Sequence, residues 1–146
     1  MNDKKPSIER IFFTDFITCG SVIAILVTIG FLLFDRFFRT LALAEQFSYF
    51  VVAVCIIGIA LIIWRIRLIS SAFEFGWEVE GDIVGVNFFR DRGTVTYIYT
   101  IQGERYKTSN AIMKHRITRS LQQGQKVVIM ANKDNPKVAF IRDIYI

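Results

Sequence analysis

The sequence predicts an α+β membrane protein, in which a two-helix transmembrane hairpin is followed by a small antiparallel β-barrel or sandwich of OB-like kind. Three observations lead to this fold class. Two long apolar runs, 16–34 and 47–64, contain no charged residue. After Trp77 the hydrophobic period changes to two, which is typical of half-buried strands. Turn signals then recur at close spacing, as they do in small barrels and sandwiches.

Each apolar run is close to the ~20 residues that carry a helix across about 30 Å of hydrocarbon. Buried core helices are the alternative interpretation, but residues 65–146 are too few to enclose two such helices on every side. A composition that is 53% hydrophobic, with a mean hydropathy of +0.40, also fits a membrane hairpin with one small domain. A cleaved signal peptide is disfavoured because Asp3, Glu9 and Asp15 precede the first run and no small-x-small cleavage pattern follows it.

Positive charges near the ends of the runs predict the orientation. More of them lie on the side of the termini than in the connecting loop: Lys4, Lys5, Arg10, Arg65 and Arg67 against Arg36 and Arg39. This bias predicts that both termini are cytoplasmic. The expected organisation is a cytoplasmic N-terminal segment 1–15, a transmembrane hairpin 16–64, a juxtamembrane connector 65–77 and a cytoplasmic β domain 78–146. The short, apolar connection 35–46 is expected in the membrane interface.

Small residues recur along the first run. Gly20, Ala24 and Thr28 are spaced by four and therefore share one helix face, where a second helix can approach closely. Two interpretations are open: the stripe packs on the second span of the same hairpin, or it docks on a helix of another subunit.

The connector carries cations and aromatic residues. Arg65 and Arg67 follow the second run directly, and Phe73, Phe75 and Trp77 come next. Aromatic residues with flanking cations are typical of an interfacial anchor. The segment either continues the second helix by a turn or two or lies along the membrane surface, and Gly76 is where the chain is expected to change course.

Beyond the connector, the clearest strand signal is the segment 94–102. Its apolar residues alternate, which places Val95, Tyr97, Tyr99 and Ile101 on one face. Further strands are expected at 79–89, 105–109, 126–131 and 138–146. Turns are expected at 90–93, at Gly103–Glu104, at Gly124 and at 133–137, and Pro136 fits a turn and not a strand interior.

The order of these motifs resembles a known family. The segments Gly81-x-Ile-Val-x-Val, Tyr97-x-Tyr-x-Ile-x-Gly103-x-x-Tyr106, Leu121-x-x-Gly124-x-x-Val127-x-Ile129 and Asn135-Pro136-x-x-Ala139-x-Ile141 are similar to the DUF3592 family of bacterial membrane-associated proteins, over residues 78–142. The resemblance implies a small β-barrel-like domain at a bacterial inner membrane, without established catalytic residues. A second resemblance, to the OB-type barrel of NfeD-like membrane proteins, shares the architecture but fits the Asn-Pro ending less well.

No motif indicates catalysis. Cys19 and Cys55 both fall inside the apolar runs, where a thiolate metal site is disfavoured. The single histidine, His115, stands in a basic stretch without an acidic neighbour in sequence to orient it. Phosphate-binding loops and serine-nucleophile elbows are absent from the sequence. We therefore expect no catalytic residues, no metal and no cofactor.

Basic residues are the best candidates for a contact surface. Besides Arg65 and Arg67, they are Arg90, Arg92, Lys114, Arg116 and Arg119. Cations beside an anionic leaflet attract lipid headgroups, and pointing away they would meet an acidic partner. The sequence thus favours a non-catalytic membrane-anchored interaction module, an accessory or scaffold subunit that contacts lipids and another membrane protein or itself. A small homo-oligomeric transport, channel-like or lipid-binding protein is the alternative. Neither nucleic acid nor a small-molecule substrate is indicated.

Overall fold

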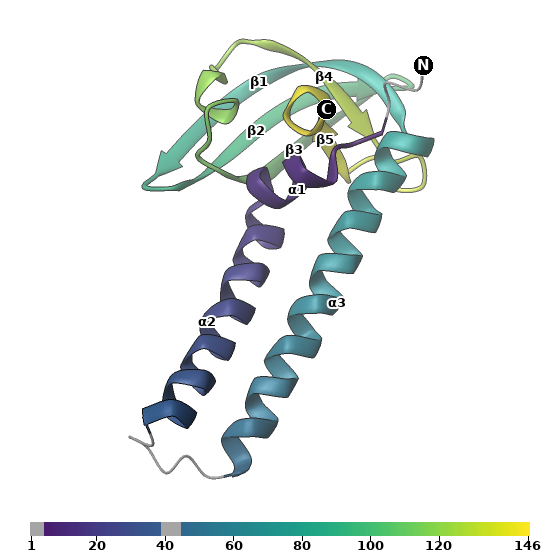
Figure 1. Ribbon diagram of the computed structural model, residues 1–146. Coiled ribbons are helices and arrows are strands. Elements are labelled where there is room, and N and C mark those ends of the chain that lie inside the picture. The colour runs from purple at the N-terminus through teal and green to yellow at the C-terminus, as the bar shows by residue number, and fades with distance from the viewer. Residues whose placement is uncertain (1–4, 39–44) are drawn as a thin grey trace.

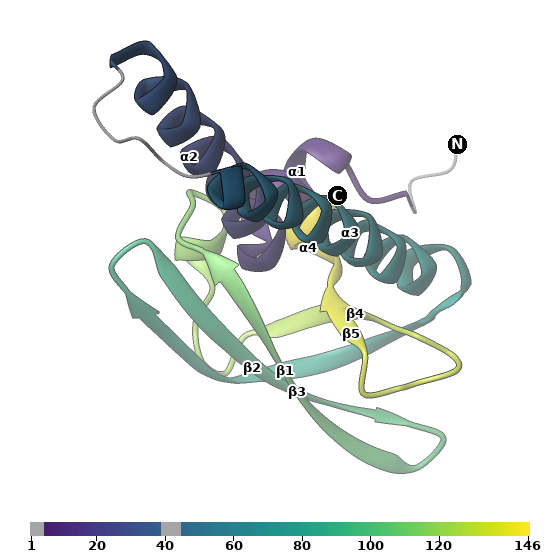
Figure 2. The ribbon, with the colours of Figure 1, turned by 90° about the horizontal axis from the view of Figure 1, so that it is seen from below.

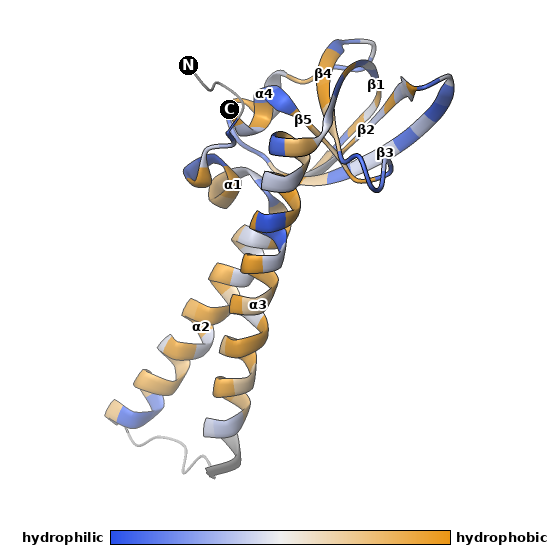
Figure 3. Cartoon of the chain, turned by 90° about the vertical axis from the view of Figure 1, so that its right-hand side faces the viewer, coloured by the Kyte–Doolittle hydropathy of each residue, from blue (hydrophilic) through white to orange (hydrophobic). Residues whose placement is uncertain are grey.

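The computed structural model describes residues 5–38 and 45–146, and consists of a helical hairpin and a β domain (Figure 1). A short helix, α1 (Ile8–Thr14), leads into α2 (Phe16–Phe38), which runs antiparallel to α3 (Glu45–Phe75). The two long helices are apolar along most of their length (Figure 3). The charges of Lys4 and Arg39 and half of the predicted connection 35–46 lie outside the described residues, and the rest of that connection forms the ends of α2 and α3.

The two long helices confirm the predicted pair of apolar helices. Both are long and apolar enough to cross a membrane, over Phe16–Phe37 and Ser48–Phe75. They contact each other where α3 carries Gly58, since a Cβ there would lie 2.8 Å from the Ile25 side chain of α2. A residue without a side chain thus lets the helices approach closely.

Helix α3 does not end where the apolar run ends. Its 31 residues would extend about 46 Å at 1.5 Å per residue, well beyond the ~30 Å of a hydrocarbon core. The last turns enter the β domain, where Ile69, Ala72 and Phe73 are buried. Most of the predicted connector 65–77 is therefore the end of one continuous helix, and the chain changes course at Gly76, as the sequence indicates.

The β domain is a five-stranded antiparallel sheet in the order β3-β2-β1-β4-β5. Its strands are β1 (Trp77–Phe89), β2 (Arg92–Ile101), β3 (Glu104–Met113), β4 (Lys126–Ala131) and β5 (Ala139–Ile141), with a short 3-10 turn, η1 (Thr118–Ser120), between β3 and β4. The long β1 pairs with both β2 and β4 and has an irregularity between Ile83 and Gly85. The sheet curls strongly (Figure 2).

Side chains bring the two ends of the sheet together. The Tyr97 hydroxyl of β2 donates to the Ala139 carbonyl of β5 at 2.5 Å, and the Thr108 hydroxyl of β3 donates to the Lys137 carbonyl at 3.1 Å. Tyr99 also donates to the Pro136 carbonyl. The sheet is thus nearly closed, and these tyrosines explain why the alternation in 94–102 is so regular: Val95, Tyr97, Tyr99 and Ile101 all lie in the core.

The predicted last strand, 138–146, is wrong beyond Ile141. A single helical turn, α4 (Arg142–Tyr145), follows β5. Ile144 and Tyr145 are adjacent in sequence and both buried, whereas consecutive residues of a strand point to opposite faces. The turn is tied to the start of the chain by a 2.8 Å hydrogen bond from the Ser7 amide to the Tyr145 carbonyl.

Gly76 should be indispensable to the junction of α3 and β1. A Cβ there would lie 1.9 Å from the Ala72 carbonyl oxygen and 2.6 Å from the Ala131 carbonyl oxygen. We expect Gly76→Ala to lower the free energy of unfolding by about 1–3 kcal/mol or more, because backbone must move to accept the methyl group. Thermal unfolding in detergent, followed by circular dichroism, measures the change.

Gly30→Ala is the matched control for this substitution. Gly30 lies within α2, and apart from its chain neighbours and the backbone of its own helix nothing lies within 4 Å of the position that a Cβ would take there, so the substitution should be neutral or stabilising by up to about 1 kcal/mol. Equal unfolding temperatures for the two variants would contradict the steric role of Gly76.

Candidate functional site

Asp15, the residue between α1 and α2, belongs to a buried cluster at the junction of the helices and the sheet. Its extended backbone (φ −80°, ψ 120°) interrupts the helix, and its carboxylate caps α2 by accepting hydrogen bonds at 3.0 Å from the amide and the hydroxyl of Thr18. Aspartate is a favoured N-cap because it satisfies free amides of the first helical turn. A backbone bridge to Ile112 ties the same residue to β3.

Arg65 of α3 meets this carboxylate from the other helix. Its Nε and Nη2 atoms donate to Asp15 Oδ1 at 3.0 and 2.7 Å, and its guanidinium lies 5.1 Å from the centre of the Phe140 ring of β5. Asp15 is fully buried and Arg65 is only 8% exposed. One buried ion pair therefore joins both long helices to the sheet.

Tyr145 completes the cluster from α4. Its ring packs edge-on against Phe73 and Phe140, with centroids 6.1 and 5.8 Å apart. Its buried hydroxyl has no hydrogen-bond partner of acceptable geometry among the described residues. Burial raises the pKa of this phenol, and the nearby Asp15 charge raises it further. Tyr145 therefore stays neutral at physiological pH and acts as a packing residue.

The cluster has the features of a structural element and not of a catalytic one. The Asp15 carboxylate already accepts four hydrogen bonds, two on each oxygen, and it has no exposed surface that a substrate would reach. Within the described residues, no group of three or more His, Cys, Asp or Glu side chains is placed to hold a metal ion.

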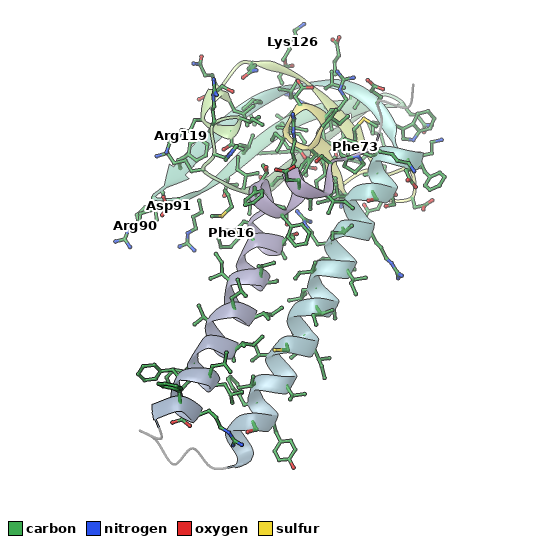
Figure 4. The ribbon with its side chains drawn as sticks, in the orientation of Figure 1. Phe16, Phe73, Arg90, Asp91, Arg119 and Lys126 are labelled. Atoms are coloured by element: carbon green, nitrogen blue, oxygen red, sulfur yellow. The ribbon has the colours of Figure 1, made fainter. Side chains whose placement is uncertain are left out.

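The structure separates the basic residues that the sequence singles out. From the sequence, Arg65 is expected to contact lipid headgroups. It is instead buried against Asp15. Arg67 is exposed on α3. Arg90 and Arg92 lie at the tip of the β1–β2 hairpin, and Lys114 adjoins them because its amide donates to the Asp91 carbonyl at 2.7 Å. Arg116 and Arg119 are in the segment that follows, and in Figure 4 Arg119 lies higher above the level of Phe16 than Arg90 does.

Each cation of the hairpin tip lies over an aromatic ring. Arg90 is 5.4 Å from the Phe89 ring centre and Arg92 is 5.8 Å from that of Phe16. Lys114 is 5.9 Å from the Phe88 ring centre. The hairpin tip thereby contacts the first residue of α2, which places basic side chains next to the beginning of an apolar helix.

The small-residue stripe does not face α3. Ala24 is exposed, and open space surrounds the position where Gly20 would carry a Cβ. Ser21 and Ile25, on the neighbouring face, meet Gly58 of α3 instead. Gly20 and Ala24 thus make no close contact with α3, while Thr28 is half-buried, and docking of the stripe on another subunit stays a prediction.

Sequence reasoning missed the pairing of Asp15 with Arg65. The signal was an aspartate directly before the first charge-free run and an arginine directly after the second. In an antiparallel hairpin these positions lie at the same end. Taken alone, Arg65 has the sequence signature of one more positive charge at the end of a span, and the carboxylate that it faces lies fifty residues away.

Comparisons with known proteins give no independent identification. No protein-family model matches the chain, and neither a curated protein nor a solved structure shows significant similarity to it.

Removing one partner of the buried pair should destabilise the fold strongly. Asp15→Asn leaves the Arg65 charge buried without its counter-ion, which costs about 3–5 kcal/mol in comparable sites. The double variant Asp15→Asn/Arg65→Met should cost less than the sum of the two single variants, because no charge is left uncompensated. Unfolding in detergent at several urea concentrations measures each value.

Arg67→Met is the matched control, since Arg67 lies two residues farther along α3 and is exposed. Its effect should stay within about 0.5 kcal/mol. Additive effects of Asp15→Asn and Arg65→Met would show that the two side chains are not coupled.

Proposed function

We propose that α2 and α3 cross a lipid bilayer and hold the β domain at its surface. The supporting observation is where their apolar side chains point. Only 11% and 17% of the most apolar 18-residue windows are buried, although core helices of soluble proteins are mostly covered. Many large apolar residues are exposed, among them Leu26, Val27, Leu33, Ile56, Ile57 and Ile63. So large an apolar surface requires a nonaqueous environment.

The dimensions of the hairpin support the same proposal. The charge-free run 16–34 has a length of about 28 Å as a helix, close to the ~30 Å of hydrocarbon. The Asp15–Arg65 pair marks one end of the apolar zone, and Asp35 and Arg36 mark the other. Trp64 is exposed beside Arg65, and tryptophan is enriched at membrane interfaces.

The orientation with the β domain in the cytoplasm follows from charge. The beginning of α1 and the end of α4 both lie at the β-domain end of the hairpin (Figure 1), together with Lys5, Arg10 and Arg67. This excess of positive charge favours the cytoplasmic side. The likeness of residues 78–142 to the DUF3592 family adds a bacterial inner membrane to the proposal.

On that membrane the chain is best described as a non-catalytic interaction module, an accessory or scaffold subunit. The sheet shares one core with Ile11, Ile69 and Phe73 of the helices, so the domain is presented in a fixed orientation. A pore is less well supported. The hydroxyls of Ser21 and Thr28 donate to carbonyls of their own helix, Ile17 at 2.9 Å and Ala24 at 2.7 Å, and α2 carries no charge between 16 and 34.

Cysteine labelling tests the topology. In a background of Cys19→Ala/Cys55→Ala, the variants Lys126→Cys and Thr40→Cys carry one thiol in the β domain and one in the connection between α2 and α3. A membrane-impermeant maleimide should label Thr40→Cys in intact cells and Lys126→Cys only after lysis. The reverse pattern would overturn the orientation, and recovery of the protein in the soluble fraction would overturn membrane insertion.

Gentle extraction tests the accessory role. The endogenously expressed protein is solubilised in mild detergent, separated on a native gel and identified by mass spectrometry. We expect it to migrate with another membrane protein at a fixed stoichiometry, because a rigidly mounted domain without a reaction site is suited to holding a partner. Migration as a free monomer or homo-oligomer would contradict that role.

A further inference from the structure

A shallow groove lies between the β1–β2 hairpin tip and the beginning of α2. Two adjoining depressions of about 240 and 270 Å³ form it, and both are bordered by Phe16, Phe89 and Arg92. We call this surface the hairpin-tip groove. The first depression is lined by Phe16, Phe89, Arg90, Asp91, Arg92 and Met113.

The groove combines positive charge with apolar surface. Arg90 and Arg92 line it, and Lys114 lies close to the same turn because its amide donates to the Asp91 carbonyl at 2.7 Å. Asp91 is the one carboxylate among the lining residues of the two depressions. Phe89 is 61% exposed although it is a large aromatic residue. Guanidinium groups match phosphate oxygens through paired hydrogen bonds, while exposed phenyl rings favour the region just below the headgroups.

The groove lies at the level where the apolar part of α2 begins, which is where lipid headgroups would be found. Its wall includes Phe16, the first residue of α2, so it opens where the apolar zone begins. In Figure 4, Arg90 and Asp91 lie at the end of the hairpin nearest Phe16, and Lys126 is at the opposite side of the domain. This step rests on the proposed insertion of α2 and α3.

The backbone at the hairpin tip has a positive φ at Arg90. Arg90 has a φ of +54°, in the left-handed region that costs most residues about 1–2 kcal/mol. Glycine adopts this conformation readily. Gln102, at the same position of the other hairpin turn, has a φ of +52°, so this conformation does not itself require an arginine, but it makes Arg90→Gly a variant that removes the charge without adding backbone strain.

The geometry points to a binding site for an anionic phospholipid in the hairpin-tip groove. Arg90 and Arg92 hold the phosphodiester, Lys114 adds positive charge, and Phe16 and Phe89 contact the glycerol backbone and the first acyl carbons. The β domain is thereby fastened to the leaflet at a second point, away from α3.

Native mass spectrometry of the full chain in detergent tests the site. Phosphatidylglycerol and phosphatidylcholine are titrated separately, and we expect tighter binding of phosphatidylglycerol. Arg90→Gln/Arg92→Gln should weaken that binding by about fivefold for each cation removed. Arg105→Gln/Lys126→Gln removes the same charge from exposed positions distant from the groove and should leave affinity unchanged.

Two single variants separate lipid binding from folding. Arg90→Gly should weaken phosphatidylglycerol binding while the unfolding temperature stays constant or rises, because glycine relieves the backbone strain. Asp91→Asn should strengthen binding, since it removes a negative charge from the groove. A gain of affinity does not arise from misfolding.

Several outcomes would overturn the site. Equal binding of the two lipids, or equal loss in the two double variants, would show that no local headgroup site exists. Competition by millimolar inorganic phosphate would indicate a soluble anion as the ligand instead. These failures leave membrane insertion intact, whereas recovery of the chain in the soluble fraction defeats the proposed function separately.

Discussion

The buried pair between Asp15 and Arg65 is the constraint on which the rest of the structure depends. Each charge stands at the end of an apolar segment, where neither the hydrocarbon nor the protein core accepts an unpaired ion. Pairing offsets their loss of hydration only when the geometry is good, so such a pair contributes more to specificity than to net stability. Here it fixes the register of α2 against α3, and the Phe140 contact fixes the sheet against both.

The same junction explains why the β domain is not a flexibly tethered module. Helix α3 continues past Arg65 for ten residues and buries Ile69, Ala72 and Phe73 in the domain core. Ile11 of α1 and Tyr145 of α4 pack in the same core. A reorientation of the sheet against the helices would have to expose all of these side chains together. The position of the β-domain loops relative to the two long helices is therefore set by the fold.

The sequence predicts those elements whose signal is local. Charge-free runs indicate the two long helices, and the alternation through Val95, Tyr97 and Tyr99 indicates a strand with one buried face. It fails where a contact between distant segments decides. Arg65 has the same local signature whether it meets a headgroup or Asp15. Residues 142–145 form a helical turn because they pack against α1 and α3. The sequence of 138–146 alone contains no signal of these contacts.

Strand β2 is joined to its neighbours by two hairpin turns of two residues each, and the first residue of both turns has a positive φ. At the end that shares a depression with Trp77, the turn residues Gln102 and Gly103 both have positive φ, and glycine takes one of the positions. This is the chemistry that a two-residue hairpin favours. At the end beside Phe16, the corresponding turn is Arg90-Asp91, with the arginine at positive φ. Arg90 and Gln102 occupy the same position in their turns, so positive φ at a residue other than glycine is common to both hairpins. The turns differ at their second position, where Gly103 has positive φ and Asp91 does not, so backbone sterics account for the glycine of one turn, whereas the charged residues of the other are not required by its backbone.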